Sequence, residues 1–539
     1  MLRRAMRRWA NVADGRKGES MGANWSRRRT LGAGLTLPAV GLLAGTPAGA
    51  QPATPLGPPQ PFSFERLVVQ AKEMALAPFQ PRRTAPQWLA DLSPQQHRAL
   101  RYRPEAAIPL GASAYSVNPV HLGSYHRAPV RVHLVEDGSA REILYDPAMF
   151  DFGAAVAPPE TLPPDTGFAG FAIHYLFAAG ESPRELLTFL GASYFRAVGR
   201  DARFGISARG LALETGLGKP EEFPAFTEFW IFRPAEPRDP LQICALLDSP
   251  SVAGAYRFDV APREGTMVAV DASLFFRADV TQVGLAPLTS MFFFGPNDDA
   301  GVDDYRARVH DSDGLAIWRA NGETLWRPLV NPEELRISVF SDENPRGFGL
   351  FQRERGFAAY GDLDARFDRR PNLWVEPKGA WGKGSVRLIE IPILDEAHDN
   401  IVAFWTPEDP VTAGRELRVA YSLLWSLAAP LETGLIPVLA TRIGQGGEAG
   451  GERSDELRRV VIEFGPPAAA LPPDALPEPT LECHNGECSA PVLRRNDGTG
   501  GWQVAFDVRP GDGAVELRCQ LTREGKPVSE TWLYRLDDS

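Results

Sequence analysis

Two short acidic loops contain residues that could perform acid–base chemistry. They read His310-Asp311-Ser312-Asp313-Gly314 and Asp395-Glu396-Ala397-His398-Asp399-Asn400, and each interrupts apolar, strand-like sequence. Hydrolysis of a glycosidic bond needs two carboxyl groups, held on opposite sides of the bond. Asp-Ser-Asp-Gly is also ordinary turn sequence, because Asp accepts backbone hydrogen bonds and Gly adopts positive φ. The two loops are therefore candidate catalytic elements, and turn formation is the alternative interpretation.

Other catalytic chemistries lack the residues that they need. No Gly-x-Ser-x-Gly elbow frames a serine, and the eight histidines form no His-Glu-x-x-His cluster. Neither Gly-x-Gly-x-x-Gly opening a helix nor a phosphate-binding loop is present in the sequence. We therefore expect no metal and no cofactor.

The N-terminal residues resemble an export signal. Arg27, Arg28 and Arg29 precede an uncharged run from Thr30 to Ala50 that closes with Ala48-Gly49-Ala50. This arrangement predicts a twin-arginine signal peptide over residues 1–50 and a periplasmic location. A membrane anchor is the alternative, but the run is rich in Gly and Pro, and no later stretch is apolar enough to span a bilayer. We expect no stable membrane anchor.

The charge balance limits the class of partner. Removal of residues 1–50 would leave 48 Lys and Arg against 66 Asp and Glu, a net charge of −18. Such an acidic surface repels nucleic acid phosphates and anionic lipid headgroups. We expect a neutral or small ligand and no nucleic acid partner.

The four cysteines suit an oxidising compartment. Cys483 and Cys488 flank His484-Asn485-Gly486-Glu487 and could close a small hairpin disulfide. A zinc site that includes His484 is the alternative, although the spacing matches no common zinc finger. Cys244 lies in an apolar run and is expected to be a buried thiol.

Composition and periodicity predict an all-β fold. The 49 Pro and 51 Gly leave little room for long helices, and many short runs alternate apolar and polar residues. Examples of such runs are 130–134, 386–391 and 416–421. Helices are expected over 64–75 and, as short turns, over 94–100 and 183–190. The spacing of the runs favours large antiparallel sandwiches.

The chain is too long for one core, so at least two domains are expected. A break in the strand pattern places a linker at residues 428–438. It would separate a large β-sandwich, residues 51–427, from a smaller immunoglobulin-like sandwich, residues 439–539. Runs 502–508 and 515–519 suit the strands of the smaller unit.

Several blocks of sequence between residues 62 and 427 are distinctive. They include Leu190-Gly191-Ala192-Ser193-Tyr194-Phe195-Arg196, Gly205 to Ala212, Ala245 to Pro250, Ala286 to Phe292, His310-Asp311-Ser312, Glu343-Asn344-Pro345 and Trp381 to Val386. In this order the blocks resemble the periplasmic glucan biosynthesis family (MdoG/OpgG and OpgD), and the similarity extends over most of residues 62–427. The twin-arginine signal makes the chain more similar to the D type.

The resemblance implies a fold, a substrate and a reaction. The implied fold is a large galactose mutarotase-like β-sandwich with a long cleft, joined to a small immunoglobulin-like domain. The implied substrate is β-1,2-linked glucan, which family members hydrolyse and some relatives transglycosylate. Asp399 matches the family's general acid and Asp311 its general base, as in an inverting endo-β-1,2-glucanase. The alternatives are a transglycosylase, or a glucan-binding scaffold for a membrane glucan synthase.

Further residues are candidates for substrate binding. Family members commonly have Tyr where this chain has Phe367, so a hydroxyl is missing there. Trp374, Trp381 and Trp405 lie on the same segment as Asp399, and their flat faces suit glucose, although core packing is the alternative. Arg209 and Lys378 could donate hydrogen bonds to sugar hydroxyls, with solvated or ion-paired positions as the alternative.

Overall fold

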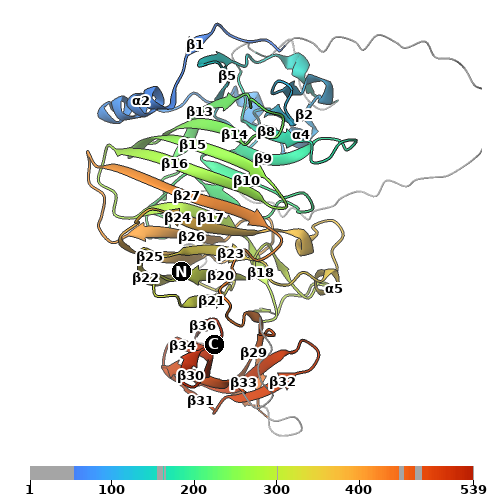
Figure 1. Cartoon of the computed structure of the whole chain (residues 1–539), viewed down its shortest axis with the longest axis vertical. Helices are drawn as coiled ribbons and strands as arrows, with labels where there is room; N and C mark the ends of the chain where they lie inside the picture. Colours follow the sequence, from blue (N-terminus) through green and yellow to red (C-terminus); the bar gives the residue numbers. More distant parts are fainter. Residues whose placement is uncertain are drawn as a thin grey trace, which may run out of the picture. The chain divides into compact units, whose positions relative to one another are not determined.

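The computed structural model describes residues 54–153, 162, 166–299, 301–447, 454–467 and 476–537. In this part strands predominate and helices are few and short, so the all-β prediction is confirmed (Figure 1). The predicted twin-arginine signal, residues 1–50, lies outside the described residues. No helix among the residues that the structure describes is long and apolar enough to cross a membrane.

The larger sheet has 16 strands, most of them antiparallel. In spatial order they are β1 (Gln60–Pro61), β6 (Ser139–Glu142), β5 (Arg131–Glu136), β13 (Ala225–Phe232), β14 (Leu241–Asp248), β15 (Val252–Pro262), β16 (Thr266–Phe276), β27 (Glu416–Ser426), β24 (Asn372–Lys378), β23 (Gly347–Phe351), β20 (Gly314–Trp318), β21 (Thr324–Pro328), β36 (Thr531–Leu536), β34 (Val515–Arg523) and β30 (Glu478–His484), with β35 (Lys526–Pro527) beside β34.

The second sheet has 11 strands. Their order is β22 (Arg336–Glu343), β25 (Lys383–Glu390), β26 (Ile401–Pro407), β17 (Val283–Ser290), β11 (Ser207–Arg209), β10 (Tyr194–Ala197), β9 (Arg184–Leu190), β8 (Gly170–Tyr175), β4 (Tyr115–Val120) and β3 (Ile108–Pro109), with β12 (Ala212–Leu213) beside β17. Two small pairs join β18 (Phe292–Phe294) to β19 (Val309–His310) and β2 (Arg101–Tyr102) to β7 (Phe150–Asp151).

The main core lies between these two large sheets. Phe189 of β9 lies 5.1 Å, centroid to centroid, from both Phe229 of β13 and Phe258 of β15. All three rings are buried, and the same cluster includes residues of most strands in both sheets. Inward and outward side chains alternate along strands such as β27, whose buried positions recur every second residue. The alternating runs predicted at 130–134, 386–391 and 416–421 are strands of these sheets.

Two of the predicted helices are confirmed. Helix α2 (Phe64–Leu76) begins at Ser63, whose side chain accepts a hydrogen bond from the Arg66 backbone, and it packs Leu67 and Ala71 against β14 to β16. Helix α4 (Pro94–Ala99) begins with a capping box formed by Ser93 and Gln96. The remaining helical elements are short: α3 (Gln87–Ala90), α5 (Phe357–Tyr360) and the 3₁₀ turns Pro104–Ala106, Pro147–Met149 and Phe367–Arg369.

The helix expected over 183–190 is wrong, because this segment is strand β9. Its residues pair on one edge with β8 and on the other with β10. Leu186, Leu187 and Phe189 are all buried, so both faces of the strand are covered. The local apolar spacing is compatible with either a helix or a strand. Backbone pairing with strands on both edges stabilises the strand.

The C-terminal residues form a five-stranded sheet and also extend the larger one. The five strands are β28 (Val438–Gly446), β29 (Ser454–Phe464), β33 (Gly501–Pro510), β31 (Gly486–Cys488) and β32 (Val492–Asn496). Strand β36 pairs in parallel with β21, and Trp532 shares a core with Trp326 and Phe351. Residues 54–539 therefore form one compact unit. The predicted domain limits and the galactose mutarotase-like and immunoglobulin-like assignments stay predictions.

The cysteine pairing is confirmed. Cys483 and Cys488 form a disulfide between β30 and β31, which excludes the alternative zinc site. Cys244 is a buried free thiol on β14 that faces helix α2, and Cys519 is also buried and free.

Glu530 joins the C-terminal strands to the larger sheet through a buried ion pair. Its two carboxylate oxygens accept hydrogen bonds from Arg353 at 2.7 and 2.9 Å, and one also accepts from the Val438 backbone at 2.8 Å. We expect Glu530→Gln to lower the free energy of unfolding by about 3–5 kcal/mol, because it leaves a buried guanidinium without its counter-charge. Urea unfolding followed by tryptophan fluorescence measures the change.

The matched control is Glu516→Gln, which removes an exposed partner 4.0 Å from Arg535. We expect that change to cost less than about 1 kcal/mol. Equal effects of the two substitutions would contradict the role given to Glu530.

Candidate active site

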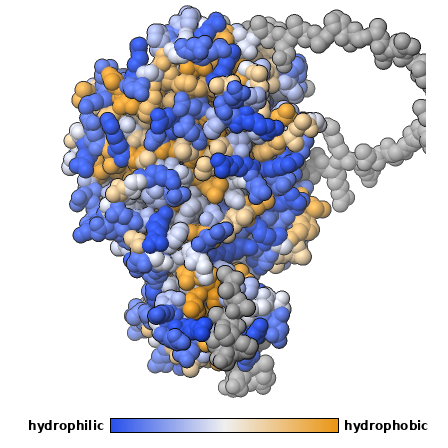
Figure 2. Space-filling view, in the orientation of Figure 1, coloured by the Kyte–Doolittle hydropathy of each residue, from blue (hydrophilic) through white to orange (hydrophobic). Residues whose placement is uncertain are grey.

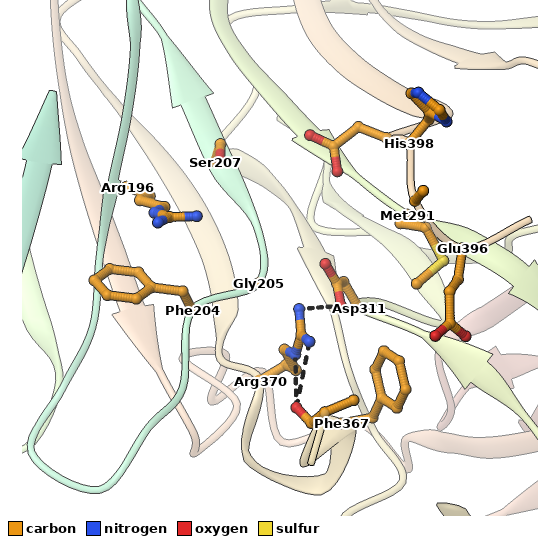
Figure 3. Close-up of a pocket in the computed structure, with 13 residues that line it drawn as sticks. Arg196, Phe204, Gly205, Ser207, Met291, Asp311, Phe367, Arg370, Glu396 and His398 are labelled. Atoms are coloured by element: carbon orange, nitrogen blue, oxygen red, sulfur yellow. Dashed lines mark hydrogen bonds and ion pairs between the residues drawn. The ribbon is translucent and has the colours of Figure 1, made fainter. Parts of the chain in front are cut away.

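A polar pocket is lined by residues of strands β10 and β11 and of several loops (Figure 3). It encloses about 270 Å³ of free space. Both predicted catalytic carboxylates line it, one from each acidic loop. The lining residues are Arg196, Phe204, Gly205, Ser207, Met291, Asp311, Ala365, Phe367, Arg370, Glu396, Ala397, His398 and Asp399.

Backbone hydrogen bonds fix the loop that carries Asp311. The loop follows β19, and the Asp311 N–H donates to the Met291 carbonyl at 2.8 Å. The Ser312 hydroxyl lies 2.7 Å from that of Ser290 at the end of β17. Asp311 is thereby held against the residues that link β17 to β18.

The same residues anchor the loop that carries Asp399. The buried Asn400 accepts a hydrogen bond from the Phe292 N–H at 2.8 Å and donates to the Phe292 carbonyl at 2.9 Å. The Asn400 N–H donates to the Ser290 carbonyl at 3.0 Å. Because both acidic loops are attached to residues 290–292, Asp311 and Asp399 face one pocket although 88 positions separate them in the sequence.

Asp313 and Gly314 are structural. The Asp313 carboxylate accepts hydrogen bonds from the backbone N–H groups of Arg353 and Glu354, at 3.1 and 3.4 Å. A Cβ on Gly314 would lie 2.1 Å from the Trp326 ring, so close packing rather than a positive φ requires glycine here. Turn chemistry therefore explains Asp313, and Asp311 is the residue of this loop that faces the pocket.

Asp311 is a buried carboxyl beside a cation. Its pKa is raised to about 6, chiefly by burial and also by the negative charges of Asp399 and Glu396, while Arg370 acts in the opposite direction. The Arg370 guanidinium lies 2.7 Å from Asp311 Oδ1. At neutral pH Asp311 is therefore ionised and paired, and it can accept a proton.

Asp399 also has a raised pKa. The largest cause is loss of hydration within the pocket, although the residue itself is exposed to solvent. The positive charges of Arg209, Arg196 and Arg370 lower the pKa and so act in the opposite direction. Arg209 does not line the pocket; it contacts Glu221 at 2.8 Å and donates to the Thr289 hydroxyl at 2.9 Å. The pocket thus gathers carboxyl groups of altered acidity among arginines, an arrangement typical of acid–base sites.

The histidines next to these carboxylates have different environments. His310 is buried, stacks on Phe292 with ring centroids 5.4 Å apart, and places Nδ1 2.7 Å from Gln352 Oε1. Burial lowers its pKa to about 3, so the ring is neutral. His398 is exposed, with Nδ1 3.6 Å from Asp395. Among the described residues, no cluster of three or more His, Cys, Asp and Glu is arranged to hold a metal ion.

Arg306 connects three segments around the pocket. It contacts Asp304 at 2.7 Å, Asp362 at 3.0 Å and Glu396 at 2.6 Å. Asp362 precedes the segment that contains Phe367, and Glu396 belongs to the loop of Asp399. In Figure 3, Glu396 lies on the side of Asp311 opposite Arg196. The walls of the pocket are therefore joined by one guanidinium.

The structure brings only some of the predicted substrate-binding residues to the pocket. Phe367 lines it, with its ring 4.8 Å from the Arg370 guanidinium. Arg209 does not line it, although its charge lowers the pKa of Asp399. Trp405 on β26 and Trp374 on β24 are buried in the two cores, against the expectation that their rings face a sugar.

Trp381 and Lys378 lie elsewhere. The partly buried Trp381 packs against Trp405 and Tyr421, with ring centroids 6.2 and 6.1 Å away. Lys378 is exposed and pairs with Glu376 at 2.7 Å. Neither residue lines the pocket, so substrate binding by them stays a prediction.

Sequence reasoning missed Arg370, Glu396 and Arg306 as members of the site. Glu396 belongs to the second acidic loop, but the sequence does not indicate which side chains of that loop face the pocket. Arg370 follows Phe367 by three residues, which in a 3₁₀ turn returns a side chain to the same side. Arg306 carried no local signal, because its partners Asp362 and Glu396 are distant in sequence.

Comparison with known proteins identifies close relatives. Residues 62–536 match the family described as periplasmic glucan biosynthesis protein, MdoG. The chain is 43% identical to glucans biosynthesis protein D of Xanthomonas axonopodis pv. citri over 89% of its length and 91% of the relative. It is 42% identical to glucans biosynthesis protein D 1 of Ralstonia nicotianae, with 94% and 97% coverage. It is also 43% identical to glucans biosynthesis protein G of Rhodopseudomonas palustris, with 95% and 99% coverage. Because D and G proteins match equally well, the similarity to the D type stays a prediction.

Loss of Arg306 should loosen the pocket walls. We expect Arg306→Gln to speed amide hydrogen exchange in residues 361–366 and 391–400 by about tenfold, which corresponds to about 1.4 kcal/mol of local stability. Hydrogen exchange followed by mass spectrometry measures this change.

The control is Arg319→Gln, which removes ion pairs to Glu323 at 3.0 Å, between β20 and β21, and to Asp342 at 4.0 Å on β22. This variant should leave exchange in the two loops unchanged. If Arg306→Gln also left it unchanged, the loops would not depend on Arg306.

Proposed function

Because the chain belongs to the family of the periplasmic glucan biosynthesis protein MdoG, we propose that it is an inverting endo-β-1,2-glucanase. Family membership by itself gives the chain a role in periplasmic glucan biosynthesis. The observation that carries the finer proposal is that Asp399 and Asp311 line the same pocket and both have raised pKa values.

Asp399 is proposed as the general acid. A glucosidic oxygen leaves poorly unless it is protonated, and a raised pKa keeps a carboxyl group protonated at higher pH than usual. Its exposed position at the pocket mouth gives a glucan chain access to it.

Asp311 is proposed as the general base. The Arg370 guanidinium at 2.7 Å favours the ionised carboxylate that must take a proton from water. Water attacking the anomeric carbon on the face opposite the departing oxygen inverts its configuration. The proton on Asp399 leaves with the departing sugar, and the proton of the water remains on Asp311.

Phe367 modifies this chemistry. Its ring contributes a pocket wall beneath Arg370, and the hydroxyl that a tyrosine would place there is missing. A proton path to Asp311 that runs through such a hydroxyl is therefore unavailable, and water must fill the role.

The periplasm is the proposed location, with export through the twin-arginine signal of residues 1–50. The family description names periplasmic glucan biosynthesis, which agrees with that signal. The Cys483–Cys488 disulfide supports an oxidising compartment.

Loss of the acid should abolish hydrolysis without abolishing binding. We expect Asp399→Asn to lower turnover of linear β-1,2-glucan by at least about a hundredfold, because the leaving oxygen is no longer protonated. Chromatography of the products and polarimetry give their size and anomeric form, and calorimetry gives binding.

Asp395→Asn is the matched control, since Asp395 is an exposed carboxylate of the same loop that does not line the pocket. It should retain activity. Products without a net gain in reducing ends would identify a transglycosylase instead. Bound glucan that stays unchanged would favour a scaffold that serves a membrane glucan synthase.

The pH dependence of kcat/KM should depend on Asp311. A base with a pKa of about 6 loses activity as the pH falls through that value, because the carboxylate becomes protonated. Arg370 lowers the pKa of Asp311, so Arg370→Met should shift this acidic limb to higher pH by about 1 unit or more.

The neighbouring Arg369 provides the control, because it lies 3.9 Å from Asp368 and does not line the pocket. Arg369→Met should leave the acidic limb in place. An unchanged limb in Arg370→Met would remove Asp311 from the role of base.

A further inference from the structure

Three large apolar side chains are strongly exposed close to the pocket. Tyr305, Leu363 and Leu394 are 81%, 75% and 97% exposed. Among the described residues, Leu76 at the end of α2 is the other large apolar side chain exposed to this extent. Figure 2 shows that apolar side chains on the visible face are scattered among hydrophilic ones. Single exposed apolar residues are ordinary, but several on neighbouring loops mark a binding surface.

The ion pairs of Arg306 bring together the three loops that carry these side chains. Tyr305 precedes Arg306 directly, Leu363 follows its partner Asp362, and Leu394 lies two residues before its partner Glu396. The Arg306 guanidinium lies 5.5 Å from the centroid of the Tyr305 ring. The three loops that carry these residues therefore meet at one partly buried cation.

The same loops continue into the pocket. Ala365 and Phe367 follow Leu363, and Glu396 to Asp399 follow Leu394, all as lining residues. Tyr305, Leu363 and Leu394 do not line the pocket themselves. They form a rim outside it, on the loops that present Asp399 and Phe367.

We propose that this rim, Tyr305, Leu363 and Leu394, binds glucose units of the glucan that extend beyond the pocket. The inference rests on the proposed function and adds a binding subsite to it. The CH faces of a pyranose ring are apolar and pack on an aromatic ring or aliphatic side chain, while its hydroxyls face outward. Charged groups flank the rim at Asp304, Asp362 and Glu396, which suits a ligand that is polar at its edges.

The size of the rim favours a polymer chain over a protein partner. A stable protein interface covers roughly 800 Å² on each partner, whereas three side chains offer a few hundred. A glucan chain that enters the pocket must also pass over the loops that line it, which carry Leu363 and Leu394. The rim would thus favour long substrates and an endo mode of attack.

The experiment compares ligands of two lengths in protein that does not turn over. In the Asp399→Asn background, calorimetry measures the Kd of a long linear β-1,2-glucan and of a β-1,2-linked glucotriose. Tyr305→Ala should weaken binding of the long glucan about five- to tenfold and leave the trisaccharide unchanged. Leu394→Ala should act in the same direction.

Two controls separate the rim from general effects of substitution. Tyr305→Phe retains the ring face and should bind the long glucan as the parent does. Leu76→Ala removes an equally exposed side chain on α2 and should have no effect. Thermal unfolding verifies that all variants are folded.

Three results would overturn the inference. Unchanged affinity for the long glucan in both Tyr305→Ala and Leu394→Ala would exclude the rim. Equal weakening for both ligands would mean that the residues act on the pocket itself. Dissociation of an oligomer by Leu394→Ala, seen by sedimentation, would assign the rim to a protein interface.

A different result would overturn the proposed function itself. If the parent Asp399→Asn protein bound neither glucan, both the proposed function and the rim would be excluded.

Discussion

Negative charge inside the pocket requires cations close by, and arginine side chains from neighbouring segments supply them. Burial alone would keep Asp311 protonated, because a carboxylate loses hydration in a protein interior. Arg370 opposes that effect at 2.7 Å, and Arg306 forms an ion pair with Glu396 at 2.6 Å. The balance leaves Asp311 with a pKa of about 6, ionised near neutral pH and still basic enough to accept a proton.

The two sheets supply the rigidity that this balance needs. Residues 290–292 receive hydrogen bonds from both acidic loops, through Asn400 on one side and the Asp311 N–H on the other. The pleated strands behind them are packed by rings such as Phe189 and Phe258. A loop held in this way keeps its carboxyl group in place when a ligand binds, so that reorganisation during a proton transfer is small.

The C-terminal strands contribute to the same region. Glu530 holds the Arg353 side chain, and the Arg353 N–H donates to Asp313, two residues from Asp311. Trp326 packs closely over Gly314 and beneath the Arg353 guanidinium, 3.5 Å from its ring centroid. The β20–β21 hairpin therefore lies between the C-terminal core and the acidic loop. This contact pattern connects the C-terminal strands to the rest of the compact unit that begins at Thr54.

The sequence by itself determined the all-β class, the helices at 64–75 and 94–100, the Cys483–Cys488 pair and the two acidic loops, because each depends on local periodicity, capping or spacing. Only the tertiary structure decided the rest. Segment 183–190 became a strand because neighbours pair with both of its edges. Trp405 and Trp374 became core residues because facing sheets cover them. Arg370 and Arg306 joined the site because their carboxylate partners come from distant segments, and electrostatic attraction across a folded pocket leaves no periodic trace in a sequence.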